Sequence, residues 1–191
     1  MKLGILGSTR GTHLGNLLTA IDQGKLSADI TVVISNKLDA FILERARARG
    51  IPAVHISSKG LDRETYDREV QKVLSAHGVE LVVMIGYMRI VSSWFVAQWP
   101  KRMLNVHPSL LPRHAGLMDL SVHQAVLTAG DTETGCTVHF VEEIVDGGEI
   151  ILQKSCPVAR EDSAETLKVK VQQLEGEALI AAINMLTRRT Q

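Results

Sequence analysis

Residues 2–18 read KLGILGSTRGTHLGNLL, an apolar segment followed by a glycine-containing turn and by leucines at helical spacing. The segment 2–6 is typical of a buried strand, and Gly7–Gly11 ends it. A helix is predicted to follow, with Thr12 as its cap and Gly24 at its end. Its inward face carries Leu14, Leu17, Leu18 and Ile21. A strand, a turn and a helix in this order form the repeating unit of a parallel α/β fold.

The same unit recurs along the first half of the chain. Further strands are predicted over 29–34, 53–56, 80–85 and 103–106, and helices over 40–49, 63–77 and 92–98. This alternation favours a mostly parallel, doubly wound sheet with helices on both faces. After residue 107 the pattern changes to a proline-containing loop, a helix over 122–129, strands over 135–141 and 149–156, and a closing helix over 163–186.

Length and charge limit the classes of function. The chain has 191 residues, which indicates one domain, and its 21 Lys and Arg residues balance 21 Asp and Glu residues. A net charge of zero argues against binding nucleic acid or an anionic membrane through bulk charge. It leaves room for a local anion site at a helix N-terminus.

The cysteines and the N-terminus bear on the cell compartment. Cys136 and Cys156 form neither a disulfide framework nor a close-spaced zinc site, and we expect both in the core. The first residues lack the layout of a signal peptide, and the longest apolar runs are too short to span a bilayer. We expect a cytoplasmic protein that does not associate with membranes.

Two loops that follow predicted strands are candidates for contacting a ligand. Gly7–Gly11 precedes a helix N-terminus, where backbone N–H groups can face an anion, but a simple tight turn fits equally well. Its spacing matches neither a dinucleotide fingerprint nor a P-loop. The second loop, Gly86–Ile90 (GYMRI), suits a flat heteroaromatic ligand, although an ordinary core-capping connection also accounts for it.

Asn105–Pro112, NVHPSLLP, is the most informative motif. The two-residue alternation of a strand places Asn105 and His107 on one face. An amide can hydrogen-bond a developing oxyanion, and an imidazole can hold or pass a proton near neutral pH. The pair therefore indicates acyl transfer to an amine, although a single histidine is also a common core residue.

The segment Val145–Gly148, VDGG, supplies the third polar group. Asp146 can orient an imidazole or take a proton, while D-G-G is also a common turn. Ser109 does not lie in a nucleophile elbow, so direct attack by a substrate amine is favoured over an acyl-enzyme.

These motifs in this order resemble the folate-dependent formyltransferases, and most closely the members that formylate glycinamide ribonucleotide in purine synthesis. The similarity extends over essentially the whole chain, including SNKLDAFILERAR at 35–47. The resemblance implies a single formyltransferase domain over 1–191. It would have a Rossmann-like nucleotide-binding half at 1–100 and a catalytic half at 101–191 that completes the folate cleft.

The resemblance also implies roles for individual residues. The catalytic set would be Asn105, His107 and Asp146. Contacts with the co-substrate 10-formyltetrahydrofolate would come from Arg63, Met88, Arg89, Ile90 and Val91, with backbone around 142–146. The ribonucleotide would contact Gly11, Thr12, His13, Gln172 and Glu175. No metal, nucleic acid or membrane is expected, and a monomer or a homodimer fits.

Three positions depart from the family pattern. His13 stands where the family commonly has Asn, which puts substrate binding at this loop in doubt. The segment 116–123 (GLMDLSVH), which borders the amine substrate in the family, is atypical. Its His123 is either a surface residue of a helix or a substrate contact, and the surface position is favoured. Glu149 replaces a frequent Pro after D-G-G, which is expected to loosen that turn.

Rival functions come from the same family and from outside it. A formyltransferase acting on tRNA or on a sugar nucleotide is expected to need a further C-terminal region, and the first also a basic surface. A formyltetrahydrofolate hydrolase is expected to carry an N-terminal regulatory domain. A folate- or nucleotide-binding module without turnover is the alternative outside enzymes.

Overall fold

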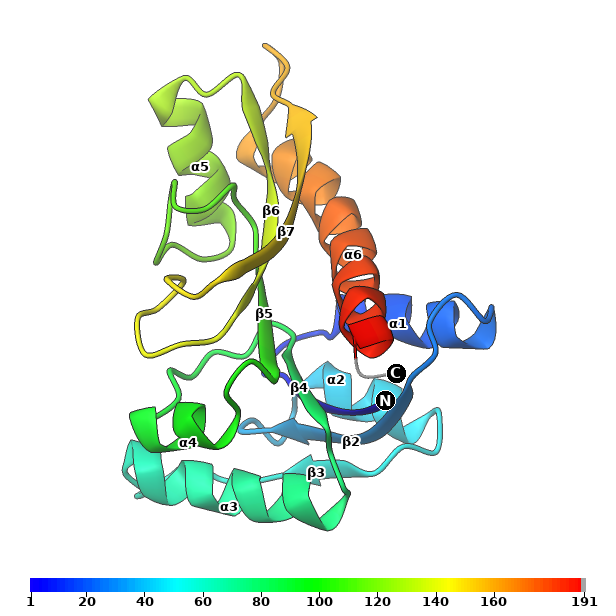
Figure 1. The fold of residues 1–191 in the computed structure, drawn as a ribbon. Helices are drawn as coiled ribbons and strands as arrows, with labels where there is room; N and C mark the ends of the chain where they lie inside the picture. The colour runs from blue at the N-terminus through cyan, green and yellow to red at the C-terminus, as the bar shows by residue number, and fades with distance from the viewer. Residues whose placement is uncertain (190–191) are drawn as a thin grey trace. The chain divides into compact units, whose positions relative to one another are not determined.

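The computed structural model describes residues 1–189 and divides the chain into two compact units (Figure 1). The first unit is Met1–Asn105, and the second begins at Val106. No helix among the described residues is long and apolar enough to cross a membrane.

The first unit contains alternating strands and helices. They are β1 (Lys2–Leu6), α1 (Thr12–Asp22), β2 (Asp29–Ser35), α2 (Phe41–Arg47), β3 (Ala53–His55), α3 (Arg63–Ala76), β4 (Leu81–Met84), α4 (Ser93–Gln98) and β5 (Met103–His107), which continues past the unit boundary. The pairs β3–β2, β2–β1, β1–β4 and β4–β5 are all parallel. The α/β class and the parallel sheet are therefore as predicted.

The order of the strands sets the positions of the helices. The chain winds outward from β1 through β2 to β3, then returns to β4 on the other side of β1. Right-handed crossovers place α1 and α2 on one face and α3 and α4 on the other. Contacts between α1 and α2 and between α3 and α4 agree with this arrangement, and Figure 1 shows α3 beside α4. The winding reverses between β1 and β4, the position where open α/β sheets bind ligands.

The second unit is built on an antiparallel hairpin. It contains α5 (Leu120–Ala129), β6 (Glu133–Phe140), β7 (Ile150–Pro157) and α6 (Ala164–Arg189). Strands β6 and β7 pair antiparallel, and the long helix α6 packs along both (Figure 1). Helix α6 has a buried apolar stripe, formed by Leu167, Val171, Ala178, Leu179, Ala182 and Ile183.

Some local predictions hold and others are wrong. Gly24 follows α1 with a positive φ angle, as predicted, and Gly50 and Gly78 follow α2 and α3 in the same way. Thr12 is not the cap of α1, because the N-cap is Gly11, with φ 66° and no side-chain hydrogen bond. Cys136 is fully buried, but Cys156 is only half-buried, because the exposed pattern of β7 leaves alternate residues near solvent.

Candidate active site

In the first unit, two loops meet where the winding reverses. The Ser8 N–H donates to the carbonyl of Gly86 (3.1 Å), and the Met88 N–H donates to the Ser8 hydroxyl (2.9 Å). That hydroxyl in turn donates to Oδ1 of Asn36 (2.6 Å). The loop after β1 therefore fixes the backbone of the loop after β4, and both sequence-predicted ligand loops belong to one hydrogen-bonded assembly.

The glycines of the first loop are required by packing. A Cβ added at Gly7 or Gly11 would overlap the side chain of Ile42 in α2. Gly11 also adopts a left-handed φ of 66° at the N-terminus of α1. His13 follows on the first turn and is buried, while Thr12 is exposed. Close packing of α2 therefore explains these glycines without a ligand, and anion binding here stays a prediction.

The loop after β4 exposes two apolar side chains and buries a third. Met88 and Ile90 are 47% and 54% exposed, whereas Val91 is buried. Single exposed apolar residues are common, but two in one loop at the ligand-binding edge of a sheet form a surface suited to a flat ring. The resemblance predicts that this loop contacts the folate co-substrate, and that contact stays a prediction.

Arg89 lies against a buried polar cluster. Its guanidinium carbon is 4.2 Å from the ring centre of Tyr66, a cation–π distance. Asp67, next in α3, accepts a hydrogen bond from the Ser92 N–H (2.6 Å), which ties α3 to the loop. Burial raises the pKa of Asp67, against the effects of that hydrogen bond and of Arg89 and Arg63. Arg63 opens α3 and is exposed.

In the second unit, the end of β5 carries His107. Its imidazole is buried, with Nδ1 3.2 Å from Oδ2 of Asp146 and Nε2 3.2 Å from the carbonyl oxygen of His114. A carbonyl oxygen can only accept a hydrogen bond, so the second contact calls for a proton on Nε2. The carboxylate calls for one on Nδ1. Both contacts are therefore satisfied together by the imidazolium ion.

Burial acts against that charge. It lowers the pKa of His107 below the usual value, and the nearby His139 lowers it further. Three acceptors or anions oppose the shift: the Asp146 carboxylate, the His114 carbonyl and the more distant Glu175. A buried imidazole held between these influences can change its charge during a reaction, as a general acid or an oxyanion-stabilising group requires.

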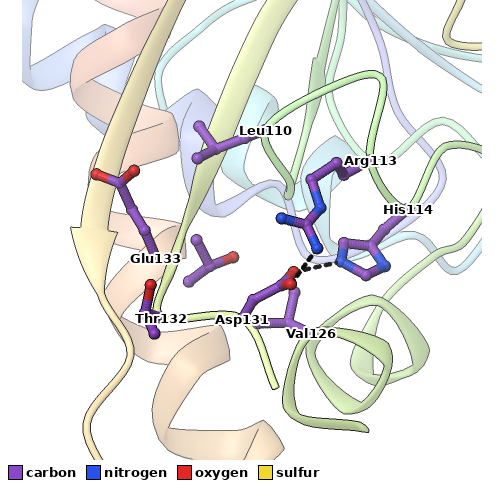
Figure 2. Close-up of a pocket in the computed structure, with 8 residues that line it drawn as sticks. Leu110, Arg113, His114, Val126, Asp131, Thr132 and Glu133 are labelled. Carbon is purple, nitrogen blue, oxygen red and sulfur yellow. Dashed lines mark hydrogen bonds and ion pairs between the residues drawn. The ribbon is translucent and has the colours of Figure 1, made fainter. Parts of the chain in front are cut away.

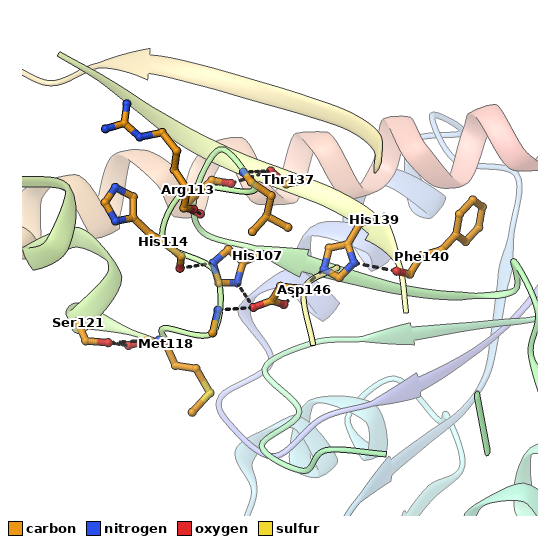
Figure 3. Close-up of polar contacts among 12 residues, drawn as sticks. His107, Arg113, His114, Met118, Ser121, Thr137, His139, Phe140 and Asp146 are labelled. Atoms are coloured by element: carbon orange, nitrogen blue, oxygen red, sulfur yellow. Dashed lines mark hydrogen bonds and ion pairs between the residues drawn. The ribbon is translucent and has the colours of Figure 1, made fainter. Parts of the chain in front are cut away.

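Asp146 receives three polar contacts (Figure 3). Besides His107, the Gly116 N–H donates to its Oδ2 (2.9 Å), and Nε2 of His139 lies 3.6 Å from its Oδ1. Burial acts to raise the pKa of Asp146, but the contacts with His139, Gly116 and His107 outweigh burial, and the net pKa lies below the usual value. Asp146 is therefore held as a carboxylate beside His107.

The glycines after Asp146 position its loop. Asp146 itself has a φ of 55°. A Cβ at Gly148 would overlap the carbonyl oxygen of Phe140, so only glycine permits the loop to return this closely to β6. The Glu149 N–H donates to the carboxylate of Glu142 (3.3 Å), a bond that proline could not make. The expected loosening at Glu149 is therefore offset by this contact.

His139 is the site residue that sequence reasoning missed. It is buried in β6, with Nδ1 2.8 Å from the carbonyl of Phe140 and Nε2 facing Asp146. In sequence it appears as an ordinary inward residue of an apolar strand. The sequence offered one signal for this position. His139 lies on a strand shortly before the D-G-G turn, and a hairpin at that turn brings the chain back toward it.

Helix α6 contributes the remaining predicted residues. Gln172 is half-buried and Glu175 is buried. The charge of Glu175 reaches both His107 and His123 and acts to raise the pKa of each. Burial nevertheless leaves the pKa of His123 below its usual value.

His123 does not lie on the surface, so that prediction was wrong. It is only 2% exposed. The reason is that Val126 lies three residues after His123 and four after Val122, so all three share the buried face of α5. Among the predicted catalytic residues, the second unit therefore brings together His107 and Asp146. Asn105, the last residue of the first unit, lies two residues before His107 on β5, which is one period of the side-chain alternation in a strand.

Comparison with known proteins identifies the family. A family model described as formyl transferase matches residues 1–183. The chain belongs to the formyl transferase family. Phosphoribosylglycinamide formyltransferase of Escherichia coli is 40% identical over 176 residues, which are 92% of this chain and 82% of that protein.

The chain is also similar to part of a much longer protein and to a solved structure. The trifunctional purine biosynthetic protein adenosine-3 of Drosophila melanogaster is 40% identical over 192 residues, covering 99% of this chain but 14% of that protein. This formyl transferase chain thus spans a small part of such relatives. The crystal structure of glycinamide ribonucleotide transformylase 1 from Symbiobacterium toebii matches with a TM-score of 0.90 and 38% identity, over 96% of this chain and 85% of that one.

Proposed function

We infer that this protein transfers the formyl group of 10-formyltetrahydrofolate to the amine of glycinamide ribonucleotide, a step of purine biosynthesis. The observation that carries the proposal is the buried contact between His107 and Asp146, in a chain of the formyl transferase family. A relative named for this activity, 40% identical over 82% of its own length, supports the choice of amine.

The proposed reaction is direct amine attack. The unprotonated amine attacks the formyl carbon, and the carbonyl oxygen becomes an oxyanion. The Asn105 amide and the His107 imidazolium stabilise that oxyanion, as preorganised donors do in acyl transfer. Asp146 sustains the imidazolium charge and helps to move the proton from the amine. The attacking nitrogen loses a proton, the bond from the formyl carbon to N10 of the folate breaks, and N10 takes up a proton.

The binding residues of the proposal divide into two groups. The co-substrate contacts Arg63, Met88, Arg89, Ile90 and Val91, of which Met88 and Ile90 offer the exposed apolar surface described above. The ribonucleotide contacts Gly11, Thr12 and His13 through its phosphate, and Gln172 and Glu175 through its ribose. A helix N-terminus without a side-chain cap supports phosphate binding at α1.

Three further parts of the proposal concern the protein as a whole. We assign one formyltransferase domain to 1–191, acting in the cytoplasm on small molecules without nucleic acid or a membrane. Each step above uses only side chains of this chain. Among residues 1–189, no group of three or more His, Cys, Asp or Glu residues is arranged to hold a metal ion.

The test is an assay of 10-formyltetrahydrofolate consumption with and without glycinamide ribonucleotide. Consumption that requires the ribonucleotide, with formylated ribonucleotide as product, is the expected result. Release of formate without it would instead indicate a hydrolase, and binding of the folate without any reaction would indicate a module without turnover. Substituting methionyl-tRNA or an amino-sugar nucleotide for the ribonucleotide tests the other formyltransferases.

A further inference from the structure

The loop 113–116 contacts both His107 and Asp146 through its backbone. The His107 Nε2–H donates to the His114 carbonyl (3.2 Å), and the Gly116 N–H donates to Oδ2 of Asp146 (2.9 Å) (Figure 3). One short segment therefore holds the far side of the imidazole and one oxygen of the carboxylate. Any displacement of this segment moves both groups at once.

The backbone of this segment adopts angles that need support. His114 has a φ of 59° and Gly116 a φ of 76°. A residue other than glycine keeps a left-handed angle only where the surrounding structure compensates for the strain. Histidine adopts this angle more often than most residues do but lacks the freedom of glycine, so the contacts of His114 help to hold it.

The support comes from Asp131 (Figure 2). Its Oδ2 lies 2.8 Å from Nε2 of His114, and its Oδ1 pairs with the Arg113 guanidinium. The Asp131 side chain is only 5% exposed, while Arg113 is 63% exposed. A cavity of about 180 Å³ lies beside these residues, so no dense packing replaces the ionic contacts on that side.

Asp131 is itself rigidly placed, at a position that does not favour a carboxylate. Helix α5 is capped at its C-terminus by Gly130, with φ 68°, and the Asp131 N–H donates to the Val126 carbonyl (3.2 Å). The C-terminus of a helix carries partial negative charge, which repels an anion. The carboxylate therefore depends on Arg113 and His114 as much as they depend on it.

We propose that Asp131 is a positioning residue: its carboxylate holds the Arg113 and His114 side chains, so that the loop presents a carbonyl to His107 and an N–H to Asp146. Asp131 contacts no reacting atom. It acts through the backbone of 114–116, and its loss leaves His107 and Asp146 present but less precisely held. Its effect on turnover rests on the proposed function, whereas its effect on His107 does not.

The decisive variant is Asp131→Asn, read out in two ways. The first is an NMR titration of the His107 ring in the ligand-free protein, with the resonance assigned by its absence from His107→Gln. The ring also faces Asp146, His139 and Glu175, which the variant leaves in place. Losing the His114 acceptor lowers the His107 pKa, by about one unit if a charged hydrogen bond is lost.

The second readout is steady-state kinetics of formyl transfer. We expect kcat to fall by about tenfold to a hundredfold because the catalytic groups are misplaced, with both KM values nearly unchanged. Asp162→Asn is the matched control. Asp162 is a similarly buried carboxylate of the same unit, with a side chain that is 4% exposed and paired with Lys170. Its hydrogen bonds go to Lys170, Ala159 and Thr166, away from loop 113–116. Its variant is expected to lose stability and keep both the titration and kcat.

His114→Asn provides a second route if Asp131→Asn does not fold. Asparagine tolerates the left-handed angle but is too short to reach Asp131. We expect it to reproduce the changes of Asp131→Asn, and the double variant to lose no more than either single one.

Two results would overturn the inference. One is a folded Asp131→Asn with wild-type His107 titration and wild-type kcat. The other is a raised KM for the ribonucleotide at unchanged kcat, which would make Asp131 part of substrate binding. If the wild-type protein transfers no formyl group, the proposed function fails, and the titration alone still decides the role of Asp131.

Discussion

Nδ1 of His107 lies 3.2 Å from Oδ2 of Asp146, although the two residues are 39 positions apart in the chain. Each partner offsets the cost of burying the other. The carboxylate acts to raise the His107 pKa against burial, and the imidazole acts to lower the Asp146 pKa against burial. Two buried groups whose charges depend on each other in this way are typical of a catalytic site.

Asp146→Asn tests this dependence. Without the carboxylate, the His107 pKa falls further below its usual value, so the imidazolium is present only at lower pH. We expect kcat at pH 7.5 to drop by about a hundredfold or more, with the optimum of kcat moved to lower pH. Asp22→Asn, which breaks an exposed ion pair with Arg49, should change neither. An unchanged pH profile in Asp146→Asn would remove Asp146 from the proposed mechanism.

Asn105→Asp tests the oxyanion donor. The substitution keeps the shape of the side chain but replaces an N–H donor with an acceptor that repels an oxyanion. Loss of one such donor costs about a hundredfold to a thousandfold in kcat, with smaller changes in KM. Circular dichroism and thermal melting establish that the variant is folded. If its kcat matched that of the wild type, the amide would have no role in stabilising the transition state.

The buried histidines predict a loss of stability in mild acid. Burial lowers the pKa of both His107 and His123 in the folded state, so the unfolded chain binds more protons below about pH 6.5. Their stabilising contribution is therefore complete above that pH and is lost as pH falls toward the folded-state values. Urea unfolding between pH 8 and 5 should show this decline, and His123→Gln should reduce its slope.

The strands and helices could be predicted because their patterns are local. The apolar runs of β1, β2 and β4 and the glycines that end α1 and α3 lie within a few residues of one another. The bounds of the predicted strands and helices differ from those in the structure by at most three residues at either end. Local patterns of this kind depend on backbone sterics and on the period of apolar residues, which the chain carries at every position.

Which residues come together in the site depends instead on contacts between distant parts of the chain. His139 and Asp131 resemble an inward strand residue and a turn residue in sequence, and only the hairpin and the end of α5 bring them to Asp146 and His114. His123 was misplaced because it shares the buried face of α5 with Val122 and Val126. The distance between two side chains from different elements has no local signal, so it could not be predicted from one sequence.

Ser8→Ala tests the link between the two loops of the first unit. Ser8 is buried, and its hydroxyl joins the Met88 N–H to Asn36. Its loss leaves the loop 86–91 less ordered, so we expect KM for 10-formyltetrahydrofolate to rise several-fold while kcat changes little. The lost hydrogen bonds should also cost about 1–3 kcal/mol of unfolding free energy.

Thr31→Val is the matched control for that experiment. It removes a hydroxyl of the same unit, which donates to the Leu3 carbonyl (3.3 Å), and keeps the branched shape. It should leave KM for the folate unchanged. Equal KM values for Ser8→Ala and the wild type would show that the loop 86–91 does not need this hydroxyl, or that it does not bind the folate.

Gly148→Ala tests how closely the Asp146 loop must return to β6. The added methyl group would overlap the Phe140 carbonyl oxygen, a backbone atom that cannot move aside alone, so the loop must shift and carry Asp146 with it. We expect a loss of about 1–3 kcal/mol in urea unfolding, together with a fall in kcat. Gly24→Ala is the control, because Gly24 has a φ of 66° but no atom within 4 Å of an added Cβ. It should cost about 1–2 kcal/mol through backbone strain and leave kcat unchanged. If Gly148→Ala lost stability and kept kcat, the position of Asp146 would tolerate movement of its loop.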